Sequence, residues 1–251
     1  MFKEGDFVSR YSYDNDIVFI ITKIENNNYI LKGANERLVA DAPIEDLKKE
    51  NEARENFTAC KPKLEEREDY FYMPGKILHI DADMDYLNRC LKYYKDASIW
   101  ATGKCINENE IKYKIKDLII EFSPNIVVIT GHDAYNKNKN IYKNSQNFAD
   151  AIREARSYEK SHEKLIIIAG ACQSDYEELI KAGANFASSP KRINIHALDP
   201  AIIATKISMS DATKEINLKE ILENTKYGSD GIGGIITKGT MYMGYPRWSK
   251  M

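Results

Sequence analysis

Short apolar runs alternate with segments of helical periodicity from residue 74 onward, and this alternation constrains the fold more than any other feature of the sequence. The apolar runs predict strands at 76–81, 97–102, 126–130, 165–169 and 185–188. The segments between them predict helices at 84–94, 111–122, 148–158 and 176–182. Because strands that alternate with helices form right-handed βαβ units, we expect a three-layer α/β domain built on a parallel sheet.

The first 49 residues have a different pattern, which is typical of a small all-β module. Runs rich in β-branched and aromatic residues lie at 6–10, 17–22, 28–32 and 37–40, with turn residues between them. About five short strands in so short a stretch favour a small SH3-like β-barrel. The charged stretch that follows is interpreted as a linker or a solvated helix. The predicted organisation is therefore a barrel at 1–49, a linker at 50–73 and the α/β domain at 74–251.

The glycine-rich tail after residue 224 shows little regular periodicity. It is expected to form loops and a short hairpin. The glycines are compatible either with a lid over a site or with simple connectors, and the sequence leaves both open.

Composition narrows the classes of function. Lys and Arg total 36 and Asp and Glu total 38, so the formal net charge of −2 argues against binding to nucleic acid or to an anionic membrane through bulk positive charge. No apolar run approaches the roughly 20 residues needed to cross a bilayer, and the first residues lack the apolar core of a signal peptide. The spacing of Cys60, Cys90, Cys105 and Cys172 matches no zinc-binding pattern, so no metal site is expected.

One histidine and one cysteine follow expected buried strands directly. His132 comes after the strand at 126–130, and Cys172 comes after the strand at 165–169. Because ligands of open parallel sheets bind beyond the carboxyl ends of the strands, both side chains are expected at the same edge. A thiolate is a good nucleophile, and a neighbouring imidazole raises the thiolate fraction near neutral pH. We therefore predict a His132–Cys172 catalytic dyad, with His196 as the main rival base or a site-shaping group.

The backbone around this pair is expected to supply an oxyanion hole. The predicted N–H donors are those of Cys172, Asp133 and Gly131, because small residues and tight turns expose backbone donors at strand ends. Acyl transfer of this kind needs no metal and no organic cofactor.

Asp81 and Asp83 follow the first strand of the α/β domain and have two readings. They can cap the helix that begins near residue 84. They can also form an acidic pocket for a substrate guanidinium, which pairs with a carboxylate in a bidentate manner. If neither of them binds the substrate guanidinium, the other acidic candidates are Glu177, Asp199 and Asp230. Asp175 is interpreted as a helix N-cap.

Three segments together resemble a known family. They are Gly131-His132-Asp133-Ala134-Tyr135, then Gly170-Ala171-Cys172-Gln173-Ser174, and the long block from Ala182 to Pro200. They resemble the YabG family, the sporulation-specific cysteine peptidases of spore-forming Firmicutes, over nearly the whole chain. The order of strand and His, then strand and Cys, is similar to the caspase, gingipain and clostripain group. That group usually has Gly after the His, whereas this chain has Asp133.

The resemblance implies a caspase-like fold and a peptidase that cuts after arginine. Its implied partners are protein substrates of the spore coat, the cortex and the germination machinery, and self-cleavage in the N-terminal part is implied as well. The implied location is the mother-cell cytoplasm of the sporulating cell, with possible association with the spore coat. Asp81 or Asp83 would bind the substrate arginine.

Two other readings stay open at this stage. An amidotransferase-like thiol hydrolase also uses a cysteine on a strand-to-helix turn, and it would need a Glu or Asp that orients the histidine. A non-catalytic spore-assembly scaffold would retain its function after Cys172→Ala or His132→Ala. Neither the oligomeric state nor the role of the N-terminal barrel follows from the sequence.

Overall fold

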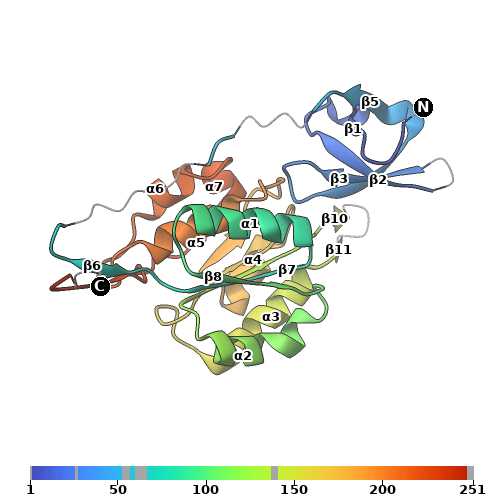
Figure 1. Cartoon of the computed structure of the whole chain (residues 1–251). Helices are drawn as coiled ribbons and strands as arrows, with labels where there is room; N and C mark the ends of the chain where they lie inside the picture. The colour runs from blue at the N-terminus through green and yellow to red at the C-terminus, as the bar shows by residue number, and fades with distance from the viewer. Residues whose placement is uncertain (1, 26–27, 53–56, 60–66, 137–140, 248–251) are drawn as a thin grey trace. The chain divides into compact units, whose positions relative to one another are not determined.

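The computed structural model describes residues 2–25, 28–52, 57–59, 67–136 and 141–247. The chain divides into two compact units, Met1–Thr58 and Ala59–Met251 (Figure 1). Each unit is described by itself below.

The first unit is a five-stranded antiparallel sheet with the strand order β4-β3-β2-β1-β5. Its strands are β1 (Phe7–Arg10), β2 (Phe19–Glu25), β3 (Asn28–Gly33), β4 (Val39–Pro43) and β5 (Leu47–Glu50). Two 3₁₀ turns, Tyr11–Tyr13 and Ile44–Asp46, follow β1 and β4. One face buries a small apolar cluster that includes Val8, Ile21 and Leu31, and this burial holds the strands together.

About five strands were predicted in the first unit, but β5 was not located in the sequence. It pairs antiparallel with β1 along its whole length, and its last residue, Glu50, falls in the stretch that was interpreted as a linker. Leu47 turns into the core while Lys48 and Lys49 face outward, and buried Glu50 accepts a hydrogen bond from the Ser9 hydroxyl at 2.8 Å. With a single apolar residue, the strand leaves almost no periodic signal.

The second unit is built on a six-stranded sheet with the order β14-β13-β12-β9-β7-β8. The strands are β7 (Ile77–Asp81), β8 (Ala101–Cys105), β9 (Ile126–Thr130), β12 (Ile166–Ala169), β13 (Phe186–Ser188) and β14 (Ile232–Gly234). The first five are parallel to their neighbours, as predicted, and β14 is antiparallel to β13. The central strands β7, β9 and β12 are fully buried, which explains the apolar sequences of β9 and β12, whereas β7 also buries the polar side chains of His79 and Asp81.

Helices cover both faces of this sheet (Figure 1). On one face lie α2 (Ile111–Phe122), α3 (Ser145–Tyr158) and α4 (Tyr176–Ala182), which share a core with alternate strand residues such as Leu78, Val127 and Ile167. On the other face lie α1 (Met84–Asp96) and α5 (Asp199–Ser208). Two short helices, α6 (Leu218–Glu223) and α7 (Gly228–Gly231), precede β14. The predicted mixed α/β architecture with a mostly parallel sheet is confirmed.

Several predicted elements are corrected. The second strand is Ala101–Cys105 and not 97–102, because Ser98 adopts a left-handed conformation in the turn after α1 and Trp100 is exposed. Helix α5 was not predicted. Its residues are buried almost all round, so it has no polar stripe to mark a helical period. Helix α3 begins three residues earlier than expected.

The tail forms more regular structure than predicted. Ile232–Gly234 joins the main sheet as its edge strand β14. Strand β15 (Tyr242–Gly244) pairs antiparallel with β6 (Phe71–Met73), so the end of the stretch expected as a linker also contributes a strand. A second small pair joins β10 (Tyr135–Asn136) to β11 (Ile141–Tyr142). No helix in the described ranges is both long enough and apolar enough to span a membrane.

Candidate active site

The residues predicted to carry chemistry follow three strands that lie side by side. The parallel register aligns Asp81 of β7 with Thr130 of β9, and Ile129 of β9 with Ala169 of β12. His132 and Cys172 therefore leave the sheet at the same edge, from adjacent strands, as the sequence predicted. The two loops bond to each other directly, since the Tyr135 N–H donates to the Gln173 side-chain oxygen at 3.4 Å.

Cys172 lies in a tight turn after β12, at residues 170–175. Gly170 adopts φ +115°, and a Cβ there would lie 3.0 Å from the Ser188 Cβ, so the turn requires glycine. The Cys172 side chain is fully buried. Its Sγ accepts a hydrogen bond from the Ile195 N–H at 3.2 Å and lies 3.7 Å from the Ile195 carbonyl oxygen. The sulfur is thus held against the segment that follows β13.

His132 lies between two carboxylates. Its Nε2 is 3.6 Å from the Asp83 Oδ2, and its Nδ1 is 3.8 Å from the Glu108 Oε1. The His132 backbone N–H also donates to the Glu108 Oε1 at 2.8 Å. All three side chains are partly exposed. This arrangement can stabilise a positive charge on the imidazole when it takes a proton.

Glu108 was missed in the sequence analysis. It lies in the loop after β8, whose carboxyl end is at the same edge of the sheet as those of β7 and β9. The signal was available in the sequence, since Glu108 follows a strand as Asp83 and His132 do. The misplaced boundary of the second strand obscured it, because a strand at 97–102 puts Glu108 several residues past the strand end.

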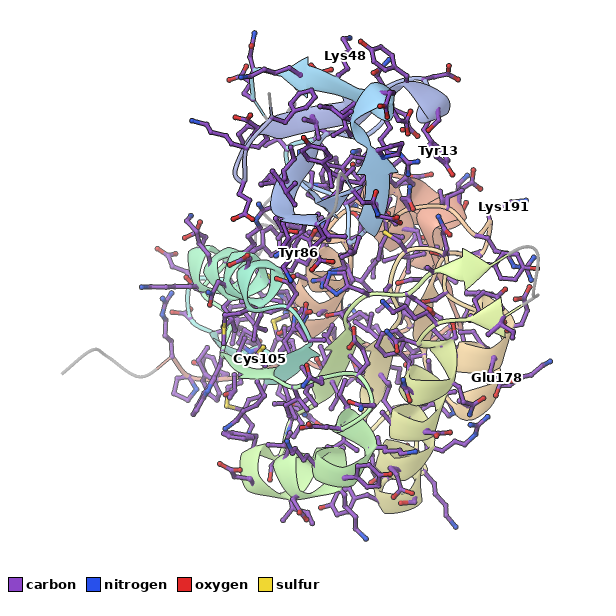
Figure 2. All side chains as sticks on the ribbon, turned by 90° about the vertical axis from the view of Figure 1, so that its right-hand side faces the viewer. Tyr13, Lys48, Tyr86, Cys105, Glu178 and Lys191 are labelled. Carbon is purple, nitrogen blue, oxygen red and sulfur yellow. The ribbon has the colours of Figure 1, made fainter. Side chains whose placement is uncertain are left out.

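Cys105 lies at the end of β8 (Figure 2). The pKa of its thiol depends on the acidic side chains near it. Burial raises the pKa of its thiol, and the negative charges of Asp81, Asp83 and Glu108 raise it further. Three carboxylates therefore gather at the carboxyl ends of β7 and β8. Opposite charge in a substrate would be favoured here.

The two aspartates after β7 have different surroundings. Asp81 is fully buried, and its oxygens accept hydrogen bonds from the Thr130 hydroxyl at 2.8 Å and from the Asp83 N–H at 2.9 Å. Asp83 caps α1 by accepting from the N–H groups of Asp85 and Tyr86, and its other oxygen faces His132. Of the two aspartates expected to bind a substrate guanidinium, only Asp83 remains a candidate. Asp81 is buried inside the protein, whereas Asp83 is partly exposed.

Asp133 is buried immediately after His132. Its carboxylate accepts hydrogen bonds from the N–H groups of Ala134 and Asn144 and from the hydroxyls of Ser145 and Ser174. Burial raises the pKa of Asp133, and these four hydrogen bonds act in the opposite direction. The expected oxyanion donors were backbone groups, so this side chain adds a feature that the sequence did not indicate.

His196 is almost fully buried in the segment that leads into α5. The imidazole Nδ1 accepts a hydrogen bond from the Leu198 N–H at 3.2 Å, and the backbone N–H of His196 donates to the Asp199 Oδ2 at 3.0 Å. Asp199 is fully buried, whereas the other two alternative acids, Glu177 and Asp230, are exposed on α4 and α7. Asp175 caps α4 by accepting from the Glu178 N–H, as expected.

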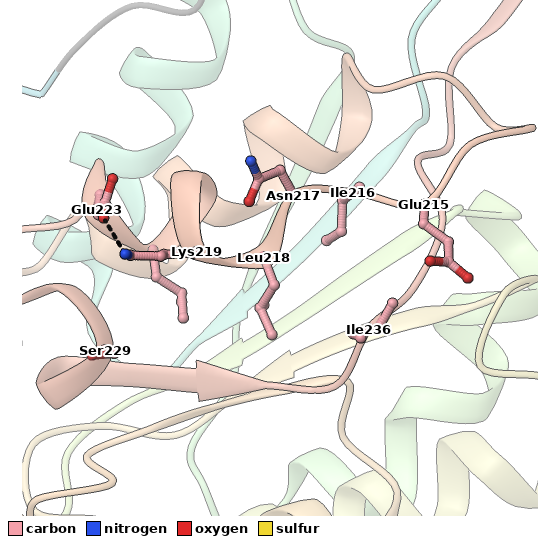
Figure 3. A pocket seen from close by; sticks show the side chains of 9 residues that line it. Glu215, Ile216, Asn217, Leu218, Lys219, Glu223, Ser229 and Ile236 are labelled. Carbon is pink, nitrogen blue, oxygen red and sulfur yellow. Dashed lines mark ion pairs between the residues drawn. The ribbon is translucent and has the colours of Figure 1, made fainter.

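A hollow in the described part of the chain lies away from these residues. It is bounded by the segment before α6, by α6 itself and by Ile236 beyond β14, and the Lys219–Glu223 ion pair borders it (Figure 3). None of the strand-end residues discussed above lines it. Within the described ranges, no three His, Cys, Asp or Glu side chains are grouped so that they could hold a metal ion. Cys60 lies outside the described residues.

Comparisons with known proteins identify the family to which the chain belongs. The family model described as YabG peptidase U57 matches residues 3–63 and 51–246. The two matches overlap at residues 51–63, which include the boundary between the two units. The chain is also 40% identical to the sporulation-specific protease YabG of Bacillus subtilis (strain 168), over 98% of each chain. The chain therefore belongs to the YabG family of sporulation proteases.

Proposed function

We propose that the chain is a cysteine endopeptidase that uses His132 and Cys172. The observation that carries this proposal is the placement of both residues at the carboxyl ends of the adjacent parallel strands β9 and β12, on loops that hydrogen-bond to each other. Their chemistry suits acyl transfer, and family membership supplies the peptidase class.

The proposed reaction proceeds by nucleophilic catalysis. His132 takes the proton of the Cys172 thiol, and the sulfur attacks the carbonyl carbon of the scissile peptide bond. The oxyanion receives hydrogen bonds from the backbone N–H groups of Gly131, Asp133 and Cys172. The C–N bond then breaks as His132 returns the proton to the leaving amine, and water hydrolyses the thioester. Asp83 and Glu108 stabilise the imidazolium that forms between these steps.

Specificity for arginine is proposed to come from the acidic residues around His132. Asp83 and Glu108 each have an oxygen within 4 Å of the imidazole, whereas Asp81 is buried with the Thr130 hydroxyl on its carboxylate. Because the whole chain has a net charge of only −2, attraction of a guanidinium depends on such local carboxylates. His196 is proposed to shape the site and not to act as its base, because its Nδ1 already accepts a main-chain hydrogen bond.

The folds of both units support finer proposals. The strand order supports a caspase-like α/β domain. Two parallel strands, β7 and β8, come before β9, which leads to His132, and the antiparallel strand β14 forms one edge of the sheet. In the first unit, β1 pairs with both β2 and β5, and a 3₁₀ turn joins β4 to β5, which supports an SH3-like barrel. We propose that the barrel ends near residue 49 and that the α/β domain begins near residue 74, with β6 joined to that domain through its pairing with β15.

The biological setting is proposed from the relative's name, which calls that protein sporulation-specific. The proposed substrates are proteins of the spore coat, cortex and germination machinery, in the mother-cell compartment. Self-cleavage at an arginine of the first unit is proposed as well. Since the Cys172 thiol is fully buried, a substrate reaches it only after the groups that cover it have moved.

The test uses the full chain and three variants, Cys172→Ala, His132→Ala and Asp83→Lys. Each is incubated with an arginine-containing protein, and the cuts in substrate and enzyme are mapped by mass spectrometry. We expect wild type to cut after arginine and both dyad variants to lose at least roughly a thousandfold in rate. Asp83→Lys is expected to lose the preference for arginine. Glu121→Lys, an exposed charge reversal near the end of α2, serves as the matched control.

The outcomes separate the candidate functions. Cleavage by Cys172→Ala at the wild-type rate would exclude the dyad, and unchanged arginine preference in Asp83→Lys would place the specificity elsewhere. The carboxylates at His132 also fit an amidotransferase-like thiol hydrolase, which needs an acidic residue to orient its histidine. Release of ammonia from glutamine without protein cleavage would favour that enzyme. A scaffold would show neither reaction.

A further inference from the structure

Two serine hydroxyls hold the two ends of the turn that carries Cys172. The Ala171 N–H donates to the Ser174 Oγ at 2.9 Å, and the Asp175 N–H donates to the Ser145 Oγ at 2.8 Å. Ser174 belongs to the turn itself, whereas Ser145 is the first residue of α3. Both serines are buried, so water does not compete for these bonds.

Both hydroxyls donate to the same carboxylate oxygen. Ser174 Oγ lies 3.1 Å from the Asp133 Oδ2, and Ser145 Oγ donates to that atom as well. Because the hydroxyls accept from the turn and donate to Asp133, the proton direction of each is determined. The turn at residues 170–175 is thereby connected at both ends to one buried acid.

The other oxygen of Asp133 holds the histidine side of the site. Oδ1 accepts from the Ala134 N–H at 2.9 Å and from the Asn144 N–H at 2.7 Å. The Asn144 side-chain amide in turn donates to the His132 carbonyl at 2.7 Å. The loop that carries His132 is thus fixed by the Asp133 oxygen that the serines do not use.

We propose that Asp133 is a positioning residue that sets the geometry between His132 and Cys172, with Ser145 and Ser174 as its intermediaries. This inference rests on the proposed peptidase function and adds a role for a side chain that does not touch the substrate. This role explains why an aspartate follows the histidine. Its single carboxylate accepts hydrogen bonds from the His132 loop, from the start of α3 and from the Cys172 turn. A glycine there would leave four donors without this partner, and two of them are hydroxyls of buried serines.

The test compares Ser174→Ala, Ser145→Ala and Asp133→Asn with wild type in the full chain. Ser157→Ala is the matched control, because the Ser157 hydroxyl is on the same helix as Ser145 but donates only to the Glu154 carbonyl of its own helix. The first readout is kcat and KM on an arginine-containing peptide. We expect kcat to fall about 10- to 100-fold in the three network variants, with KM within about twofold, because misplacement of about 1 Å has such an effect.

The second readout does not require turnover. Amide hydrogen exchange is measured at Ala171 and Asp175 in the turn and at Ala134 and Asn144 on the histidine side. Ser174→Ala is expected to speed exchange at Ala134 and Asn144 as well as at Ala171, because the two sides share one carboxylate. The double variant Asp133→Asn/Ser174→Ala is expected to be no slower in turnover than Asp133→Asn alone, since residues that act as a unit are not additive.

The possible outcomes are decisive. A kcat of Ser174→Ala and Ser145→Ala that equals that of Ser157→Ala, or additive losses in the double variant, overturns the proposal. If Asp133→Asn does not fold, the two serine variants still decide, because they keep the carboxylate. If wild type cleaves no peptide, the proposed function fails. In that case amide hydrogen exchange alone tests the positioning role. Faster exchange at Ala134 and Asn144 in Ser174→Ala supports the role, and unchanged exchange at both refutes it.

Discussion

At the scale of single residues, Gly131 and Glu108 fit together because glycine lacks a side chain. A Cβ on Gly131 would lie 2.6 Å from the Glu108 Oε1 and 2.9 Å from its Cγ. The carboxylate therefore lies directly over the backbone that leads into His132, where it accepts the His132 N–H. The absence of a side chain at one position is what allows an acid to lie beside the proposed base.

This contact leads to a prediction for Glu108→Gln. The amide oxygen can still accept the His132 N–H, but the negative charge beside the imidazole is removed, so we expect kcat to fall about tenfold or more with little change in fold. Gly131→Ala should cause a similar loss by displacing the carboxylate. Glu110→Gln is the control, since Glu110 is exposed and pairs only with Lys114 among the ion pairs of the described residues. Full activity in Glu108→Gln, measured by peptide hydrolysis, would show that its charge has no part in the reaction.

At the scale of elements, Arg156 joins the ends of several helices and strands. From α3 its guanidinium donates to the carbonyls of Gly183 at the end of α4 and of Leu165 just before β12, and to the Asn185 side chain just before β13. Further donations reach the carbonyls of Glu159 and Ser161. Burial lowers the pKa of Arg156 to about 10, so the group keeps its charge at neutral pH. These bonds fix the amino-terminal ends of β12 and β13, and so the strand that delivers Cys172.

We predict that Arg156→Lys lowers the free energy of unfolding by about 3 kcal/mol, because a single ammonium cannot replace the fork of donors and leaves buried carbonyls without partners. Arg153→Lys is the matched control, one turn earlier on the same helix. Its exposed guanidinium pairs with Asp150 and Glu178, so a loss of at most about 0.5 kcal/mol is expected. Urea denaturation of both variants measures the difference, and equal losses would contradict the role given to Arg156.

At the scale of the whole molecule, the buried carboxylate of Asp133 makes stability depend on pH. Burial raises the pKa of Asp133 in the folded chain above its ordinary value, despite the four hydrogen bonds that oppose the shift. A carboxyl with a raised folded pKa binds its proton more tightly in the folded state. Its contribution to stability is therefore present below the unfolded pKa and is lost as pH rises through the folded pKa.

The prediction compares wild type with Asp133→Asn, which cannot titrate at this position. The free energy of unfolding of wild type, relative to that of the variant at the same pH, is expected to fall as pH rises from the acid range toward neutrality. Urea denaturation at a series of pH values measures this difference. A relative stability that rises over the same range would mean that the four hydrogen bonds outweigh burial and that the folded pKa is lowered.

Much of the parallel sheet could be predicted from the sequence because its central strands are buried on both faces. Residues 126–129 and 165–169 are continuously apolar, and short runs of this kind are typical of parallel strands that are buried on both faces. The rule that chemistry follows the carboxyl ends of these strands then selected His132 and Cys172. The family could be recognised for the same reason, since the motifs at these strand ends are local in sequence.

Other parts of the molecule depend on contacts between distant segments. The edge strands β8 and β14 have few apolar residues, and β5 has one, so only their partners define them. Asp81 and Asp83 are indistinguishable in sequence, yet the register of β7 beside β9 turns Asp81 toward Thr130 and leaves Asp83 near His132. Glu108 meets His132 only because β8 lies beside β7.

The sequence by itself thus determined the central strands and the two residues proposed to react, because each follows from a pattern within about ten consecutive residues. It also determined the class of fold, through the alternation of such segments along the chain. Only the tertiary structure decided which carboxylates surround His132 and how Asp133 connects its loop to the Cys172 turn. These are contacts between segments far apart in the chain, such as residues 133 and 174, and their partners are selected by packing and hydrogen bonding and not by local periodicity.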